Sequence, residues 1–264
     1  VRVRRRTERS VFTQDITLYA HSPRVEVNTH VDWHEKRRLL KVAFPVEILS
    51  PKATYHIQFA AVERPTHKNT AFDHARFEVP AQHWADLSEA DYGVSLLNDC
   101  KYAYDVRDNV LRLSLLRSPV DPDPHADEGE HDFTYALYPH ESDWRGGVVR
   151  EGYQLNAPLR AWTVEADSDQ KFASMPFEEP DRPNVIIETI KKAEDSNALV
   201  IRLYEAHGGR GKTRLHFNYT VKRIEECNLM EEPIGKCALD KHNNLIFDIK
   251  PFEIRSFLVM FADR

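Results

Sequence analysis

Residues 11–48 read VFTQDITLYA-HSP-RVEVNTHVDW-HEKRR-LLKVAFPVEI, and this stretch decides the fold class. It contains three runs in which β-branched and aromatic residues recur with the short period of a β-strand. The separators HSP and HEKRR are polar, as turns between strands are, and the first contains a proline. The stretch therefore predicts three consecutive strands.

Runs of the same type continue to the end of the chain. They lie at residues 53–63, 111–116, 132–140, 153–165, 184–194, 198–206, 213–221 and 244–261. Only residues 130–156 could contain a short helix. Strands spaced by about 8–15 residues without long amphipathic helices predict an all-β protein made of antiparallel β-sandwiches.

One segment separates two blocks rich in strand patterns. Residues 161–185, AWTVEADSDQKFASMPFEEPDRPNV, are polar and contain three prolines. Such composition is typical of a boundary between domains. We therefore predict a large β-sandwich domain over residues 1–175 and a smaller C-terminal β-sandwich over residues 176–264.

Composition limits the classes of function. The chain has 264 residues, of which 41% are hydrophobic, and a formal charge of −6. This acidic balance argues against a nucleic-acid-binding protein, which normally has a basic face. Without a run of about 18 apolar residues, no transmembrane helix is expected. Three scattered cysteines and no signal peptide favour a reduced, intracellular setting. Because the chain starts abruptly at Val1, in a pattern typical of a strand, we expect it to be a piece of a longer protein.

The loop DPDPHADEGEHD, residues 121–132, has residue types that bind metals. His125, Asp127, His131 and Asp132 are suitable ligands for zinc or manganese. Their spacing matches no compact zinc motif, however, and the prolines and the glycine indicate irregular backbone. The alternative is an acidic turn in which Asp and Pro set the backbone geometry.

Two other patterns give no specific functional site. GGRGKT at residues 208–213 lacks the spacing of a phosphate-binding loop, and we interpret it as a glycine-rich hairpin between the strands at 198–206 and 213–221. Acidic residues that could form the catalytic pair of a glycosidase are too abundant for any pair to be chosen.

The middle of the chain carries a resemblance to a known family. Residues 64–106, RPTHKNTAFDHARFEVPAQHWADLSEADYGVSLLNDCKYAYDV, and residues 111–140 closely resemble the C-terminal region of glycoside hydrolase family 38 α-mannosidases. The match is best with the branch without signal peptides, which is found in bacteria, fungi and the animal cytosol. Residues 31–48, 184–212 and 249–261 agree as well. Two departures are Ala103, where the family usually has glycine, and Phe72, where tryptophan is common.

The resemblance implies a fold and an activity. The fold is a large supersandwich-like domain of the galactose-mutarotase type, followed by a smaller C-terminal sandwich. The activity is that of a retaining enzyme that removes terminal non-reducing α-D-mannose from oligosaccharides. In the family, a divalent metal (zinc or cobalt), the nucleophile and the acid/base belong to an N-terminal domain, and nothing here matches that domain's His-x-Asp motif except His125-Ala126-Asp127, which lies in the sandwich region.

We therefore expect no catalytic residue and no metal ligand in this chain. The expected partners are a mannose-containing oligosaccharide and the N-terminal catalytic domain of the same polypeptide, in a cytoplasmic homo-oligomer. Nucleic acid and membrane are not expected as partners. The alternative is a stand-alone carbohydrate-binding or interaction module without catalysis.

The resemblance also implies substrate-binding residues. The large sandwich of the family lends an arginine to the substrate pocket from a strand end, and the pattern apolar-x-apolar-x-Leu-x-Arg aligns that position with Arg117. The alternative is that Arg117 forms a salt bridge to the acidic loop after it. Asp99 and Tyr102, in the strand–turn LLNDCKY, are further candidates for substrate binding. Asn98 and Asp99 could instead form an Asx-type turn that orders a hairpin.

Overall fold

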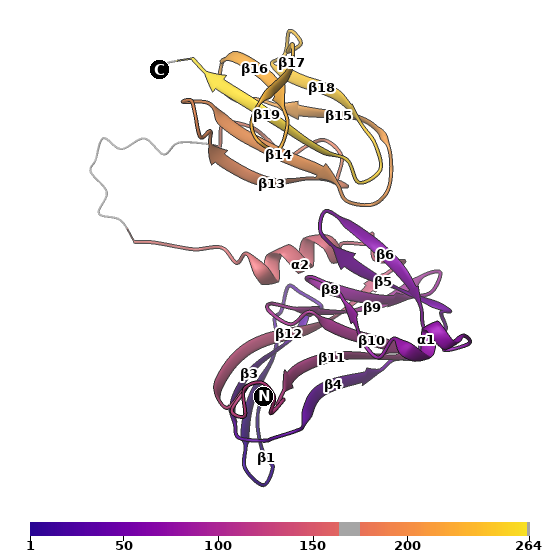
Figure 1. Ribbon diagram of the computed structural model, residues 1–264. Helices are drawn as coiled ribbons and strands as arrows, with labels where there is room; N and C mark the ends of the chain where they lie inside the picture. The colour runs from indigo at the N-terminus through magenta and orange to yellow at the C-terminus, as the bar shows by residue number, and fades with distance from the viewer. Residues whose placement is uncertain (164–174, 263–264) are drawn as a thin grey trace. The chain divides into compact units, whose positions relative to one another are not determined.

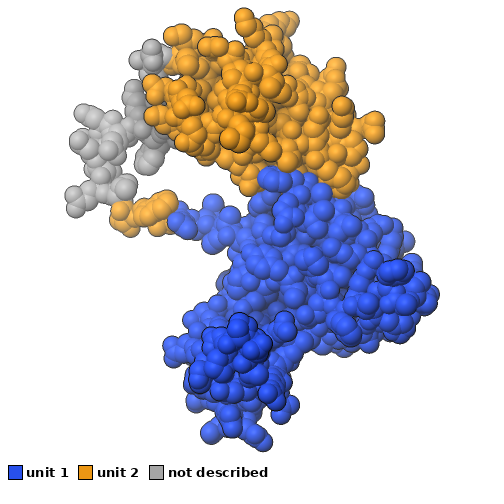
Figure 2. Space-filling model, viewed as in Figure 1, with its two compact units in different colours: residues 1–160 blue, residues 161–264 orange. Residues whose placement is uncertain are grey.

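The computed structural model describes residues 1–163 and 175–262. The chain divides into two compact units, residues 1–160 and 161–264 (Figure 2). The predicted boundary at residue 175 directly follows residues 164–174, which lie outside the described residues, so its position stays a prediction. None of the helices within the described ranges has the length and apolar character of a membrane span.

The first unit contains a large antiparallel sheet, with strands in the order β1-β2-β3-β12-β9-β8-β5-β6. Its strands are β1 (Arg2–Arg6), β2 (Val11–Leu18), β3 (Val25–Trp33), β12 (Gly129–Glu141), β9 (Tyr92–Asn98), β8 (Trp84–Ser88), β5 (Lys52–Ile57) and β6 (Ala60–Pro65). The long strand β12 lies between β3 and β9 and pairs with both (Figure 1). It therefore joins the N-terminal strands to the middle of the chain.

A smaller sheet faces the large one. Its order is β4-β11-β10-β7, with β4 (Leu39–Pro45), β11 (Val110–Arg117), β10 (Ala103–Arg107) and β7 (Val79–Pro80). Along β11, Leu111 and Leu113 are buried while the residues between them are partly exposed, because successive side chains point to opposite faces of a strand. They pack with Val31, Leu96 and Phe133 of the large sheet into one apolar core. The predicted sandwich is confirmed.

The second unit repeats this architecture on a smaller scale. One sheet has the order β13-β14-β19-β16-β17, and β15 pairs with β18 in a second sheet. The strands are β13 (Val185–Lys192), β14 (Leu199–Glu205), β15 (Gly211–His216), β16 (Val221–Cys227), β17 (Pro233–Lys236), β18 (Asn244–Ile249) and β19 (Ile254–Phe261). Their core is built from both sheets, for example Leu203 and Phe257 of one and Leu215 and Phe247 of the other.

Several local predictions were wrong. The run at residues 244–261 is two strands in different sheets, and a helix that was not expected forms at residues 71–75. Residues 53–63 are two strands rather than one, because the chain turns at Phe59, which has a positive φ of 57°. The hairpin predicted at residues 208–213 is a crossover between sheets, since β14 pairs with β13 and β19 and leaves no edge for β15. Residues 153–156 end a helix, and residues 157–163 have no regular structure; residues 164–165 of that predicted strand lie outside the described residues.

The described residues contain two short helices, α1 (Ala71–Ala75) and α2 (Val148–Asn156). The helix expected somewhere within residues 130–156 is α2. It buries Val148, Val149 and Gly152, and Gly152 lies so close to the indole of Trp84 that a Cβ there would be 2.9 Å from Trp84 Cδ1. Helix α2 therefore packs directly on β8 of the large sheet.

Candidate functional site

The turn between β9 and β10, residues 99–102, holds two of the predicted substrate-binding residues. Asn98, the last residue of β9, is buried, and its Oδ1 accepts a hydrogen bond from the backbone N–H of Lys101 at 2.5 Å. The Nδ2 of Asn98 donates to the carbonyl of Gln82 and to the hydroxyl of Tyr104. The side chain of Asn98 therefore orders the backbone of the candidate site, as the alternative from the sequence expected. The expected hairpin was wrong, because β9 pairs with β12 and β8 while β10 pairs with β11 and β7, so the turn connects the two sheets.

Asp99 is bound to the neighbouring strand β12. Its backbone N–H donates to the carbonyl of Thr134 at 3.1 Å, and its Oδ2 accepts from the backbone N–H of Thr134 at 2.9 Å. Its Oδ1 is buried and has no hydrogen-bond partner among the described residues. Asp99 thus orders the turn with one oxygen and leaves the other as an unused acceptor.

The environment of Asp99 also settles the state of the neighbouring thiol. Desolvation, with a smaller effect of the adjacent Asp99 carboxylate, raises the pKa of Cys100 to about 11. The thiol therefore stays protonated at neutral pH. Because the thiolate is the nucleophilic form of cysteine, this position does not favour nucleophilic catalysis.

Tyr102 presents its ring to solvent. Its side chain is exposed, with 54% of the residue surface accessible, while its backbone carbonyl accepts from the N–H of Ala81 at 3.1 Å. The backbone is thus fixed and the ring is free to contact a ligand. Aromatic rings stack on the apolar faces of sugars, and the hydroxyl adds a polar contact.

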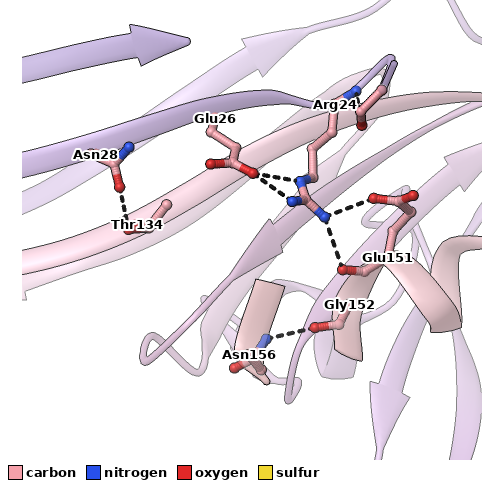
Figure 3. A network of polar contacts seen from close by, with 8 residues as sticks. Arg24, Glu26, Asn28, Thr134, Glu151, Gly152 and Asn156 are labelled. Carbon is pink, nitrogen blue, oxygen red and sulfur yellow. Dashed lines mark hydrogen bonds and ion pairs between the residues drawn. The ribbon is translucent and has the colours of Figure 1, made fainter. Parts of the chain in front are cut away.

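Helix α2 holds the turn from the other side. The Nδ2 of Asn156 donates to the carbonyl of Asn98 at 2.9 Å. It also donates to the carbonyl of Gly152 at 2.9 Å (Figure 3). The carbonyl of Asn98 directly precedes Asp99. The position of the candidate turn therefore depends on where the last residue of α2 lies.

A buried arginine anchors α2 to strand β3. The guanidinium of Arg24 donates to Glu26 Oε1 at 2.5 and 2.9 Å and to Glu151 Oε2 at 2.7 Å (Figure 3). These three side chains retain only 12–16% of their exposure. Planar two-sided pairing of this kind fixes both geometry and orientation. It locks the helix that carries Asn156 onto the sheet.

Arg117 lies at the end of β11 in the other sheet, opposite Leu39 of β4. Its backbone N–H donates to Asp127 Oδ2 at 3.1 Å, so the acidic loop binds the main chain of Arg117. Within residues 1–163 and 175–262 its exposed guanidinium has no ion pair or side-chain hydrogen bond. The alternative from the sequence, a salt bridge between Arg117 and the acidic loop, is therefore not formed among the described residues. The donors of Arg117 remain available to hydroxyls or a carboxylate of a ligand.

The three predicted residues therefore fall into two groups. The structure brings Asp99 and Tyr102 together in one turn, whereas Arg117 stands on a separate strand end, and no hydrogen bond among the described residues joins it to either. The residues that position the turn, Thr134 and Asn156, were missed. They lie 35 and 58 residues from their partners Asp99 and Asn98, so no local pattern could have revealed them.

The candidate metal ligands of the acidic loop point to separate partners. His125 Nδ1 lies 2.9 Å from Glu128 Oε2, His131 Nε2 lies 2.9 Å from the carbonyl of Asp127, and Asp132 Oδ1 lies 2.9 Å from His30 Nδ1. Across the described ranges, no three His, Cys, Asp or Glu side chains are grouped so that they could hold a metal ion. The loop is an ordered connection built from local hydrogen bonds.

A serine, a histidine and an aspartate also meet in the large sheet. Ser95 Oγ donates to Asp86 Oδ1 at 2.6 Å, and His140 Nε2 contacts the same oxygen at 2.8 Å. Because the same Nε2 also lies 3.4 Å from Ser95 Oγ, one nitrogen faces both groups, whereas a general base contacts the serine with one ring nitrogen and the carboxylate with the other. All three are buried, at 0–7% exposure. This cluster is a structural network.

Comparisons with known proteins identify the family. The model described as "Glycosyl hydrolases family 38 C-terminal domain" matches residues 1–125, and that described as "Glycosyl hydrolases family 38 C-terminal beta sandwich domain" matches residues 184–257. The two matches fall on the two sandwiches in order. This chain belongs to glycosyl hydrolase family 38. It comprises C-terminal domains of that family.

Relatives in other organisms cover nearly the whole chain. "Alpha-mannosidase 2C1" of Mus musculus is 45% identical over 258 residues, which is 95% of this chain and 24% of the mouse protein. "Alpha-mannosidase G" of Dictyostelium discoideum is 42% identical over 92% of this chain and 23% of its own length. "Alpha-mannosidase" of Saccharomyces cerevisiae is 37% identical over 90% of this chain. The chain thus spans about a quarter of the length of these relatives.

A solved structure confirms the fold. "The crystal structure of an alpha-mannosidase from Enterococcus faecalis V583" superimposes with a TM-score of 0.81 at 20% identity, over 95% of this chain and 29% of that one. At this identity the likeness concerns the fold.

Proposed function

We propose that this chain is the C-terminal part of an α-mannosidase that hydrolyses terminal non-reducing α-D-mannose residues of oligosaccharides with retention of configuration. In this proposal the large sandwich packs on a catalytic domain supplied by the N-terminal part of the same polypeptide, and completes its substrate pocket. The chain itself supplies no nucleophile and no acid/base.

The observation that carries the proposal is the 45% identity with a protein named α-mannosidase over 95% of this chain. The local geometry supports it. The exposed guanidinium of Arg117 has no ion pair within the described residues, and the ring of Tyr102 stands on a rigid turn. Held on strand ends, such groups bind hydroxyls and sugar faces with little loss of conformational freedom.

The divalent metal of the family, zinc or cobalt, does not fit the described residues. No three side chains able to ligate a metal converge within residues 1–163 and 175–262. We propose that the metal is held by the N-terminal part of the enzyme, and we assign no step of the reaction to it here. A cytoplasmic location and a homo-oligomeric enzyme are further parts of the proposal.

Hydrolysis of a chromogenic α-mannoside tests the assignment. The isolated 264-residue chain, with or without added zinc or cobalt, is expected to release no product. The polypeptide in which the same chain follows the N-terminal catalytic region is expected to turn the substrate over. Turnover by the isolated chain would refute the placement of the reactive groups. Inactivity of the longer polypeptide on all α-mannosides would refute the activity itself.

A further inference from the structure

A concave site in the first unit contains none of the predicted substrate-binding residues. It is a pocket bordered by β5, the end of β6 with residues 66–68, residues 76–78 with the start of β7, and β10. Four cationic and three acidic side chains line it. The cationic side chains that line it are Arg64, Lys68, Arg76 and Arg107.

The cations of this wall are poorly matched by acids. Arg64 lies over the ring of Tyr55, with its Cζ 4.7 Å from the ring centroid, and its Nη1 is buried without a hydrogen-bond partner among the described residues. Lys68 lies over the exposed ring of Phe77. The nearest acid to Arg76 is Asp73, at 4.0 Å. Within the described residues, Arg64, Lys68 and Arg107 form no ion pair.

The acids that line the pocket are already engaged elsewhere. Asp105 accepts from Lys41 at 2.5 Å and from Arg112 at 2.9 Å, and Glu78 accepts from Lys41 at 2.9 Å. Although burial alone would raise the pKa of Asp105, its bonds to Lys41 and Arg112 hold that pKa below its ordinary value. The carboxylates are therefore ionised, but their charges are neutralised by cations that do not line the pocket.

The third acid that lines the pocket, Asp73, caps the N-terminus of α1. Asp73 accepts hydrogen bonds from the backbone N–H and the hydroxyl of Thr70, as the capping box of α1 requires. With the acids accounted for, the pocket keeps an excess of unpaired guanidinium and ammonium groups.

The decisive feature is Arg64 Nη1, a buried donor without a hydrogen-bond partner among the described residues. A buried hydrogen-bonding group without a partner is rare in folded proteins, because its desolvation is not compensated. Burial, together with repulsion from Arg76, lowers the pKa of Arg64 from its ordinary value, so the guanidinium sits where positive charge is uncompensated. Burial also raises the pKa of Tyr55 to about 12, which keeps its phenol neutral at the floor of the pocket.

We propose that this pocket binds an oxyanion, a phosphate or a carboxylate group, with Arg64 Nη1 as the buried donor and Arg76, Lys68 and Arg107 around the entrance. Guanidinium groups match the paired oxygens of both anions in geometry and charge. The proposal is independent of the mannosidase assignment, because it uses none of the residues predicted to contact mannose.

Titration of the whole 264-residue chain tests the proposal. Inorganic phosphate and acetate are added separately at constant ionic strength, with sodium chloride as the reference salt, and binding is followed by ¹H–¹⁵N NMR. We expect saturable shifts in residues 64–68, 76–79 and 104–107, with one anion binding more tightly than the other and so identifying the preferred group. Shifts that do not saturate, or that chloride reproduces, would overturn the proposal.

Variants show whether the guanidinium is responsible. Arg64→Gln is expected to weaken binding at least about tenfold, since a charge-assisted hydrogen bond is lost. Arg160→Gln, which removes an exposed arginine outside the pocket, should bind as the unmodified chain does. If Arg64→Gln fails to fold, Arg76→Gln replaces a side chain that is 54% exposed and should still weaken binding several-fold. Unchanged affinity in the folded variants contradicts the proposal.

Discussion

Arg117 has a fixed backbone and an exposed side chain at the end of β11. The register of β11 against β4 fixes its Cα, the carboxylate of Asp127 fixes its N–H, and the side chain is left exposed without an ion pair among the described residues. A surface arginine with no partner adds little to stability. We therefore propose that Arg117 serves to bind a ligand.

Replacing Arg117 with alanine tests this role in the full-length enzyme. We expect kcat/KM for an α-mannoside to fall about 10- to 100-fold, as the loss of a charged hydrogen bond implies, while the free energy of unfolding changes by less than about 0.5 kcal/mol. Steady-state kinetics and denaturant unfolding measure the two effects. Arg4→Ala, at an exposed arginine of the edge strand β1, is the control. Wild-type kinetics of Arg117→Ala would reduce Arg117 to a surface residue.

His56 gives the sandwich a pH dependence. It stacks on Trp84 at 5.5 Å between ring centroids, and burial, with a smaller effect of the neighbouring His83, lowers its pKa to about 3. An unfolded chain binds a proton at this residue near pH 6.5. Between about pH 6.5 and 3 the unfolded chain thus holds more protons than the folded one, and stability falls as the pH is lowered through that window.

We expect the free energy of unfolding to drop by roughly 2 kcal/mol from His56 alone between pH 6.5 and 5, at about 1.4 kcal/mol for each pH unit. Urea unfolding at several pH values measures the slope. The variant His56→Phe keeps the ring stack but cannot be protonated, so its slope should be shallower. An equal slope in both proteins would show that other groups cause the acid sensitivity.

At the scale of elements, α2 determines where the candidate turn lies. It has only nine residues, and a helix this short is not stable by itself in water. Arg24 and Asn156 hold it on the sheet, the first through Glu26 and Glu151 and the second through the carbonyl of Asn98. The helix therefore couples the sheet to the turn that carries Asp99 and Tyr102.

Arg24→Ala is expected to destabilise the chain by about 3 kcal/mol, because it leaves two largely buried carboxylates without their cation. Chemical denaturation measures the loss. The matched control is Arg2→Ala, whose pair with Asp15 is 72% and 42% exposed, so its loss should change stability far less. Similar losses in the two variants would mean that the Arg24 network does not anchor α2.

Strand β9 contains a glycine that its neighbours require. A Cβ at Gly93 would lie 2.3 Å from His140 Cε1 and 2.8 Å from Ser88 Cβ, inside the buried network of Asp86. Gly93→Ala is therefore expected to cost about 1–3 kcal/mol through overpacking. Gly235→Ala, in β17 with no atom within 4 Å of the added Cβ, should change stability by less than about 0.5 kcal/mol. Thermal or urea unfolding of both variants gives the comparison, and a neutral Gly93→Ala would contradict the packing argument.

At the scale of the whole molecule, two sandwiches and the family could be predicted from the sequence. The alternation of apolar and polar residues in runs such as residues 25–33 depends on neighbours two positions apart, so it is visible in one dimension. The family resemblance likewise rests on contiguous strings. The local turn at Asn98 was readable for the same reason, because its side chain bonds a backbone N–H only three residues on.

The pairing of strands and the hydrogen bonds that position the candidate site were decided only by the tertiary structure. Glycines at residues 208–211 suit a hairpin as well as a crossover, and the choice was made by β19, which occupies the edge of β14 from more than 50 residues away. In the same way Thr134, Asn156 and Arg24 acquire their roles by contact across the fold. The sequence by itself thus determined which segments are strands and which family they belong to, because those properties depend on local period and composition. Which strands are neighbours, which arginines find an acid and which remain unpaired depend on packing between distant segments, and only the folded chain specifies them.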